Sequence, residues 1–308
     1  MLGPALLAAS RSTRLRRAVV AAPVTRRVVD RFVAGEDLGS ALAAIRRLSA
    51  TGLTVTLDHL GEDVTTEAAA TTSRDAYLAA LDAIGTAGLG GSVEVSVKLS
   101  AFGQTLPAGH DIALINVEKV AAAATDAGTT VTLDMEDSST VDSTLEVLRT
   151  LRRSHPDTGA VLQGYLFRTI EDARELAVAG SRVRLVKGAY REPPSVAHQG
   201  KKAVDAAYER CLAILMQGGG YPMIGSHDPR MIETAQRLAR ENGRTADSYE
   251  FQMLYGMRPH EQQRLVDAGF RTRTYLPYGT DWYGYFVRRL AERPANLLFF
   301  LRALTTRD

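Results

Sequence analysis

The chain has 308 residues, of which 45% are hydrophobic and 23% charged, and its 37 basic and 35 acidic residues leave a formal net charge of +2. This composition is typical of a globular protein and excludes a disordered or fibrous chain, and the small net charge provides no global attraction for nucleic acid. The sequence contains no run of 18 apolar residues, so a membrane-spanning helix is not expected. We expect one catalytic domain over residues 1–308, because α/β barrels often reach this size.

The first 50 residues differ from the rest in their arginine content. Residues 1–29 contain six arginines and no acidic residue, a composition found in organelle transit peptides and in membrane-surface helices. The whole chain uses arginine where lysine would serve, so the arginines of this segment do not by themselves indicate a targeting signal. We therefore favour an N-terminal helical arm over residues 1–50. The only cysteine, Cys211, lies in a predicted helix, and we expect its thiol to be buried as an apolar side chain. We expect a reducing, cytoplasmic location, and peripheral contact with the inner face of the membrane stays open.

Short β-branched segments alternate with longer amphipathic segments, which is the pattern of βαβ units around a parallel sheet. The predicted strands are residues 53–58, 93–100, 129–136, 159–166, 182–188, 221–226, 249–254 and 271–278. Helical periodicity lies between them, for example over residues 112–128 and 229–242. Four glycines stand where a helix would end before the next strand: Gly128, Gly180, Gly243 and Gly269.

Eight strand and helix units predict a (βα)₈ TIM-type barrel with N-terminal helices and a final helix near the carboxyl-end rim. A doubly wound Rossmann sheet is the main alternative. Its phosphate-binding glycines follow a strand, whereas the glycine-rich residues 85–91 and 218–220 of this chain precede strands. The sequence therefore favours the barrel.

Polar side chains gather at the carboxyl ends of the predicted strands, which is where barrel enzymes have their active sites. In chain order they are Asp58, His59, Lys98, Ser100, Asp134, Glu136, Gln163, Arg168, Arg184, Lys187, Ser226, His227, Gln252, Tyr275 and Tyr278. Two of the five lysines in the chain are among them. Any one charged residue at such a position could be a surface or ion-pair residue, but the whole set predicts an active site.

The final predicted helix, residues 280–293, contains two adjacent arginines. Glu292 lies four residues after Arg288 and three after Arg289, within reach of both guanidinium groups. Paired arginines suit a carboxylate or phosphate, because each offers a planar pair of donors. From the residues alone, an exposed basic helix face is the simpler interpretation.

Ten segments, in chain order, resemble the proline dehydrogenase family: RFVAGE, TLDHLGE, VKLSAFG, LDMED, LQGYL, RLVKGAY, GSHD, FQMLYG, YLPYG and YFVRRLAE. They extend from Arg31 towards the C-terminus, and the residues before Arg31 have no match. The resemblance implies FAD-dependent oxidation of L-proline to Δ1-pyrroline-5-carboxylate, the first step of proline degradation to glutamate, with electrons passed to a membrane quinone. It also implies a separate pyrroline-5-carboxylate dehydrogenase downstream, because this chain is too short to include one.

The resemblance further implies roles for individual residues. Asp134 and Arg184 would be active-site residues, with the arginine near the reactive nitrogen of the flavin. The substrate pocket would comprise Lys98, Tyr190, Leu254, Tyr275, Arg288, Arg289 and Glu292. FAD would contact Met135, Gln163, Arg184, Lys187, Gly188, Ala189, Ser226 and His227. Within the pocket, Lys98 and the two arginines would hold the proline carboxylate, which needs several cations once it leaves water.

Three other interpretations stay open. Lys98 or Lys187 would form a Schiff base in a lyase or aldolase if its pKa were depressed. Asp134, Glu136 and His227 would be the ligands of a divalent metal, but nearby cationic side chains would repel the ion, so no metal site is predicted. A barrel retained as a non-catalytic scaffold is the third interpretation.

Overall fold

The centre of the protein is a closed barrel of eight strands, ordered β1 to β8, in a computed structural model that describes residues 29–286. The strands are β1 (Thr54–His59), β2 (Val93–Val97), β3 (Val131–Leu133), β4 (Gly159–Gln163), β5 (Arg182–Val186), β6 (Tyr221–Gly225), β7 (Glu250–Leu254) and β8 (Thr272–Tyr278). Neighbouring strands are parallel, and β8 pairs with the whole of β1 to close the barrel. The predicted (βα)₈ fold and its eight strands are confirmed.

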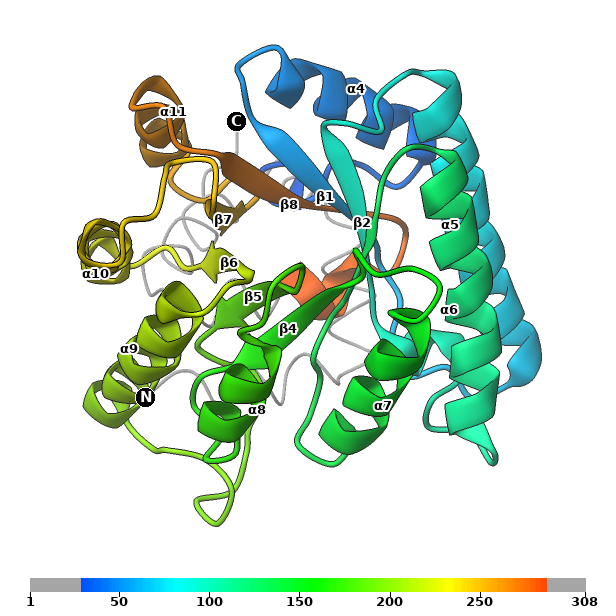
Figure 1. Ribbon diagram of the computed structural model, residues 1–308. Coiled ribbons are helices and arrows are strands. Elements are labelled where there is room, and N and C mark those ends of the chain that lie inside the picture. The colour runs from blue at the N-terminus through cyan, green and yellow to red at the C-terminus, as the bar shows by residue number, and fades with distance from the viewer. Residues whose placement is uncertain (1–28, 287–308) are drawn as a thin grey trace, which may run out of the picture.

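Helices surround the strands (Figure 1). They are α4 (Leu38–Ser49), α5 (Glu67–Thr86), the 3₁₀ helix η1 (Leu99–Phe102), α6 (Gly109–Asp126), α7 (Val141–Leu151), α8 (Thr169–Leu176), α9 (Lys201–Gln217), α10 (Pro229–Glu241) and α11 (Pro259–Asp267). All four predicted helix-ending glycines have positive φ. Gly128, Gly243 and Gly269 directly follow the last residue that caps a helix, whereas Gly180 lies in a turn beyond the end of α8.

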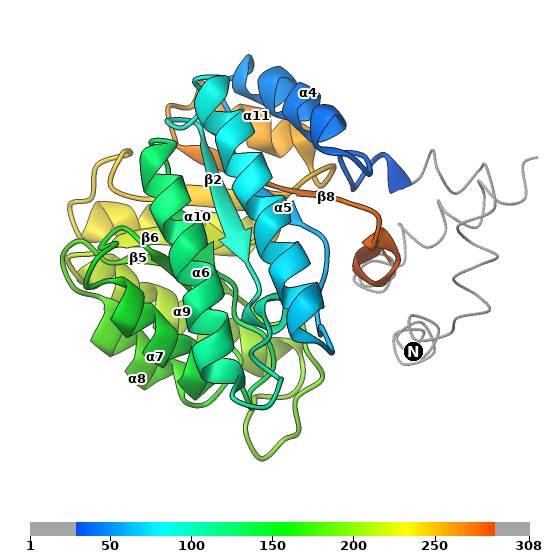
Figure 2. The same cartoon turned by 90° about the vertical axis from the view of Figure 1, so that its right-hand side faces the viewer.

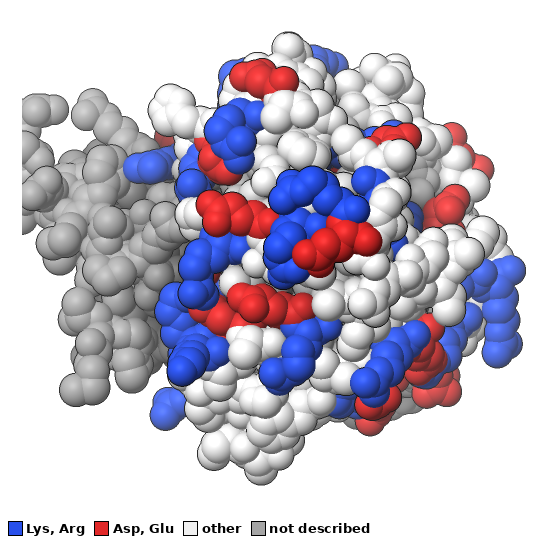
Figure 3. All heavy atoms as spheres, turned by 60° about the vertical axis from the view of Figure 1, so that its left-hand side comes forward, with Lys and Arg blue, Asp and Glu red and all other residues white. Residues whose placement is uncertain are grey.

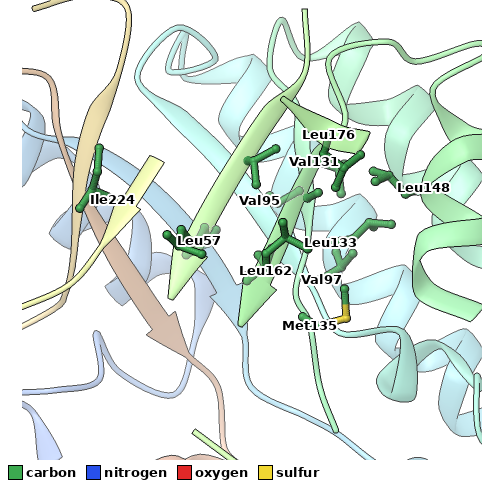
Figure 4. Packing of buried hydrophobic residues seen from close by; sticks show 14 of the residues in the cluster. Leu57, Val95, Val97, Val131, Leu133, Met135, Leu148, Leu162, Leu176 and Ile224 are labelled. Atoms are coloured by element: carbon green, nitrogen blue, oxygen red, sulfur yellow. The ribbon is translucent and has the colours of Figure 1, made fainter. Parts of the chain in front are cut away.

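The outward side of the strands is apolar and packs against the helices. Val95, Leu133 and Leu162 of three adjacent strands lie together, and Leu148 of α7 covers them from outside (Figure 4). Alternate residues of a strand point to opposite faces, so this side buries the apolar half of each strand. Cys211 of α9 belongs to the same core as a fully buried free thiol, as predicted.

The inward side of the strands includes many polar and charged residues, although barrel interiors are usually filled by branched apolar residues. We call Glu94, Arg182, Glu250 and Arg273 the charged layer. The Nη2 atom of Arg182 lies 2.6 Å from Oε2 of Glu94, and Nε of Arg273 lies 2.7 Å from Oε1 of Glu250. These residues are the first or second of their strands, so the charged layer fills the amino-terminal half of the barrel. Each buried charge has an opposite partner there, as burial requires.

Residues 29–37 lie against the carboxyl end of β8 (Figure 2). Phe32 packs in one cluster with Trp282 and Phe286, which belong to the helical residues 282–286. The Ala34 amide donates to the Pro277 carbonyl at 2.9 Å. α4 follows and contacts β1 and β8, which confirms a helix before the barrel. Residues 1–28 of the predicted arm lie outside the described residues.

Basic and acidic side chains are intermixed on the face shown in Figure 3, which includes α9 and α10. Among residues 29–286, no helix is both long enough and apolar enough to cross a membrane.

Two glycines of similar conformation give a matched test of the docking of residues 29–37. Gly256 has φ +72°, and a Cβ there would overlap the backbone carbonyl of Arg31, whereas Gly243 has φ +65° and open space around it. We expect Gly256→Ala to lower the free energy of unfolding by about 3 kcal/mol, and Gly243→Ala by about 1 kcal/mol from the left-handed conformation alone. Urea unfolding measures both values. Equal losses in the two variants would contradict the close approach of Arg31.

Candidate active site

A cavity of about 490 Å³ opens among the carboxyl ends of the strands. All predicted site residues within residues 29–286 line it: Lys98, Asp134, Met135, Gln163, Arg184, Lys187, Gly188, Ala189, Tyr190, Ser226, His227, Leu254 and Tyr275. The other three, Arg288, Arg289 and Glu292, lie outside the described residues. The barrel therefore brings together side chains that are far apart in the sequence, because parallel strands end at the same rim.

Arg184 lies at the bottom of this cavity and is held on both sides by carboxylates. It is 4% exposed. Its Nη1 donates to Oδ1 of Asp134 at 2.8 Å, and its Nη2 donates to Oε1 of Glu94 at 3.2 Å. Its Nε donates to Oε1 of Gln252. A planar guanidinium with donors engaged on every edge has one orientation, so Arg184 is a fixed positive charge beneath the cavity.

Asp134 joins Arg184 to Tyr275. Its Oδ1 accepts from Arg184, and its Oδ2 accepts from the Tyr275 hydroxyl at 2.7 Å. Burial, followed by the charge of Asp134, raises the pKa of Tyr275 well above its ordinary value of 10.0. The phenol therefore keeps its proton and donates a hydrogen bond to Asp134. The Tyr275 ring also lies 5.4 Å from the Arg184 guanidinium carbon, which is a cation–π distance.

Lys98 is a charged ammonium group at the cavity wall. Its Nζ lies 3.0 Å from both carboxylate oxygens of Asp58 and 4.0 Å from Oδ2 of Asp134. Burial alone would lower the pKa of Lys98, but the attraction of Asp58 and Asp134 outweighs burial and raises the pKa above its ordinary value of 10.5. A Schiff-base lysine needs the opposite shift, so the lyase interpretation does not fit Lys98.

The opposite wall is formed by the loops after β5 and β6. Lys187 donates from Nζ to Asp205 at 2.5 Å and to Asp228 at 2.9 Å. The Nε2 atom of His227 accepts the Leu254 amide hydrogen at 2.9 Å, which places the proton of a neutral ring on Nδ1. Gly188 has φ +116°, and any Cβ there would overlap the Tyr165 ring. Only glycine suits this position, which brings the backbone itself to the cavity.

The cavity also includes residues outside the predicted site. They are Asp58, Val161, Val186, Gly225, Asp228, Gln252, Met253, Met257 and Tyr285. Asp58 and Gln252 were recognisable as polar residues at strand ends, and period-two alternation from Thr56 would have placed Asp58 inside the barrel. The apolar members have no such signal, because the sequence alone does not separate a cavity wall from a core.

Several polar residues at the predicted strand ends lie elsewhere. Arg168 pairs with Asp142 and Asp172 on the helix side. The ring of His59 packs edge-on against Tyr278, at 5.1 Å between centroids. Among the described residues, no three His, Cys, Asp or Glu side chains are arranged to hold a metal ion, so the alternative interpretation with Asp134, Glu136 and His227 as metal ligands has no support there.

Glu136 instead forms a buried link between the loop after β3 and the 3₁₀ helix η1. Its Oε1 accepts from the Ser100 hydroxyl at 2.6 Å, and its Oε2 accepts from the Ser100 amide at 3.0 Å. Burial raises the pKa of Glu136 from its ordinary value of 4.5 to about 7. The folded protein therefore holds a proton on Glu136 at pH values where the unfolded chain has released it.

Glu136→Gln tests this link through the pH dependence of stability. The folded pKa is raised, so the wild-type protein loses stability relative to the variant as pH rises from about 4.5 to about 7, by about 3 kcal/mol in total. Urea unfolding of both proteins at about pH 5 and about pH 8 measures the change. A difference between the two proteins that is the same at both pH values would contradict the raised pKa.

Comparison with known proteins identifies the family. The family model described as proline dehydrogenase matches residues 41–302. A proline dehydrogenase of Deinococcus radiodurans is 40% identical over 90% of both chains, and proline dehydrogenase 2 of Bacillus subtilis is 38% identical over 91% of both. The solved structure of proline utilization A from Bdellovibrio bacteriovorus, inactivated by N-propargylglycine, superimposes with a TM-score of 0.81 at 28% identity. It covers 87% of this chain, which corresponds to 33% of that longer protein. This chain belongs to the proline dehydrogenase family.

Proposed function

We propose that this protein oxidises L-proline to Δ1-pyrroline-5-carboxylate with bound FAD and passes the electrons to a membrane quinone, and that a separate dehydrogenase consumes the product. The observation that carries the proposal is the convergence of Lys98, Asp134, Arg184 and Tyr275 in one cavity of a chain that belongs to the proline dehydrogenase family. The oxidation removes a hydride from the carbon beside the proline nitrogen and a proton from that nitrogen, leaving a C=N bond.

The described part of the cavity supports recognition of a small amino acid. Lys98 offers an ammonium group to the substrate carboxylate, and Tyr275 offers a ring face to the pyrrolidine ring. Leu254 and Tyr190 line the same cavity and would exclude water from the ring. In our proposal Arg288 and Arg289 complete the carboxylate site, with Glu292 paired to one of them.

The donor set of the cavity fits FAD. Apolar Met135, Val161 and Val186 lie beside the amide of Gln163, which suits a planar ring with polar edges. Lys187, His227 and the backbone at Gly188 would hold the remainder of the cofactor, as would Ala189 and Ser226. When bound, FAD supplies the hydride acceptor that no side chain provides. Arg184 would then place a fixed positive charge near the site where negative charge develops.

Anaerobic addition of L-proline to the purified protein tests the activity. We expect the visible flavin band to bleach with L-proline but not with pyrrolidine, which has the same ring without the carboxylate that the cations would bind. An absorption spectrum before and after each addition measures the outcome. A protein that lacks flavin, or that forms a borohydride-trapped imine with a carbonyl compound, would refute the proposal and favour the scaffold or lyase interpretation.

Lys98→Met should separate substrate binding from cofactor binding. The variant loses a charge-assisted contact and leaves Asp58 without its cationic partner near the substrate carboxylate, so we expect KM for proline to rise by about tenfold or more with flavin retained. Lys187→Met is the control, because Lys187 lies on the opposite wall and should affect flavin content. Steady-state kinetics and the flavin-to-protein ratio measure the two effects. A wild-type KM in Lys98→Met would exclude its role in carboxylate binding.

A further inference from the structure

Glu94 is a fully buried carboxylate that connects the charged layer to Arg184. It lies on β2 with its side chain 3% exposed. Its Oε1 accepts from the Thr56 hydroxyl at 2.7 Å and from Nη2 of Arg184 at 3.2 Å, and its Oε2 accepts from Nη2 of Arg182 at 2.6 Å. Glu94 does not line the cavity, so it acts on anything in the cavity through other residues.

The contacts of Glu94 cross the inside of the barrel. Arg182 and Arg184 are two residues apart on β5, so both point inward. The strands β2 and β5 are separated in the barrel by β3 and β4. The Glu94 carboxylate therefore bridges two inward arginines of a distant strand, and each of its two oxygens accepts a hydrogen bond from one of them.

Charge explains why Glu94 stays ionised. Burial by itself would raise its pKa, but the attraction of Arg273, Arg182 and Arg184 outweighs burial and holds the pKa well below its ordinary value of 4.5. Without this negative charge, those arginines would face each other inside the barrel with only Glu250 and Asp134 as counter-charges. Like charges at short range in a buried site repel strongly, and Arg184 is the member with access to the cavity.

We propose that Glu94 is a positioning residue for the oxidation, because it holds the Arg184 guanidinium from below while Asp134 holds it from the cavity side. The inference rests on the proposed function, in which Arg184 lies near the reacting part of the flavin. Glu94 sets the height and the plane of that guanidinium. Its loss lets Arg184 move away from the other arginines towards the cavity.

A double-mutant cycle on the flavin-bound enzyme tests the assignment. The proteins are the wild type, Glu94→Gln, Arg184→Lys and the double variant, and stopped-flow mixing with L-proline gives the limiting rate of flavin reduction and KM. We expect Glu94→Gln to lower the limiting rate by about tenfold or more, with KM unchanged within about twofold, because a displaced group at the reacting centre costs rate. In the Arg184→Lys background, the same change should lower the rate by less than about twofold.

Glu250→Gln is the matched control. Glu250 is an equally buried acid of the charged layer that pairs directly with Arg273 and reaches Arg184 only indirectly, through the amide of Gln252. Because this path is indirect, we expect Glu250→Gln to couple to Arg184→Lys more weakly than Glu94→Gln does. If Glu94→Gln lowers the rate by the same factor in both backgrounds, or couples to Arg184 no more strongly than Glu250→Gln does, the positioning role is overturned. If Glu94→Gln does not fold, Glu94→Asp takes its place in the cycle, because it keeps the charge and withdraws it by one methylene.

The midpoint potential of the bound flavin gives a readout that does not need proline. Reductive titration with dithionite should show a more positive potential in Glu94→Gln than in the wild type, because one negative charge behind Arg184 is gone. An unchanged potential would contradict the inference. A wild-type flavin that dithionite reduces but L-proline does not would refute the proposed function, and the potential shift would still show whether Glu94 acts on the flavin site.

Discussion

The structure depends on one buried guanidinium held between two carboxylates. Arg184 lies between Glu94 below and Asp134 above, at 3.2 and 2.8 Å, in the middle of the barrel. An unpaired charge there would cost several kcal/mol, whereas a paired and fully hydrogen-bonded charge is tolerated. The amino-terminal half of the barrel is therefore filled with complementary charges where most barrels have branched apolar side chains, and the carboxyl-terminal half receives a fixed cation.

This arrangement places the rigid parts of the site on strands and the adaptable parts on loops. Arg184 and Tyr275 belong to β5 and β8, and Lys98 and Asp134 directly follow β2 and β3. Hydrogen bonds to Asp134 hold Arg184 and Tyr275, and Asp58 holds Lys98. Lys187 and His227 lie on the loops after β5 and β6, and they are held by Asp205 of α9 and by the Leu254 amide of β7. Groups on regular elements with supporting hydrogen bonds keep their geometry better than groups on loops, so the strand residues suit the reacting centre and the loop residues suit cofactor retention.

The sequence predicted the barrel because its eight strands carry β-branched runs, and it predicted the cavity because parallel strands end at one rim. The polar pattern by itself did not predict which strand-end residues face inward together, whereas the residues that the family resemblance named within residues 29–286 all line the cavity. Arg168 and Glu136 are as polar as Asp134, but the first pairs outside the barrel and the second is bonded to Ser100 of η1. The contact between Glu94 and Arg184, 90 residues apart, depends on barrel closure and strand register, which no local pattern encodes. The roles of Arg288, Arg289 and Glu292 stay predictions, because these residues lie outside the described range.

Charge balance indicates why the site needs cations beyond those of the strands. In the described cavity, Lys98 is paired with Asp58 and Arg184 with Asp134, while the charged layer below balances two acids with two arginines. The strand-borne site is therefore close to neutral before a substrate enters. A substrate carboxylate would add an uncompensated negative charge in a partly desolvated cavity, which is unfavourable. Two further positive charges would reverse this balance, and the adjacent Arg288 and Arg289 of the sequence are the cations that the family resemblance assigns to that carboxylate.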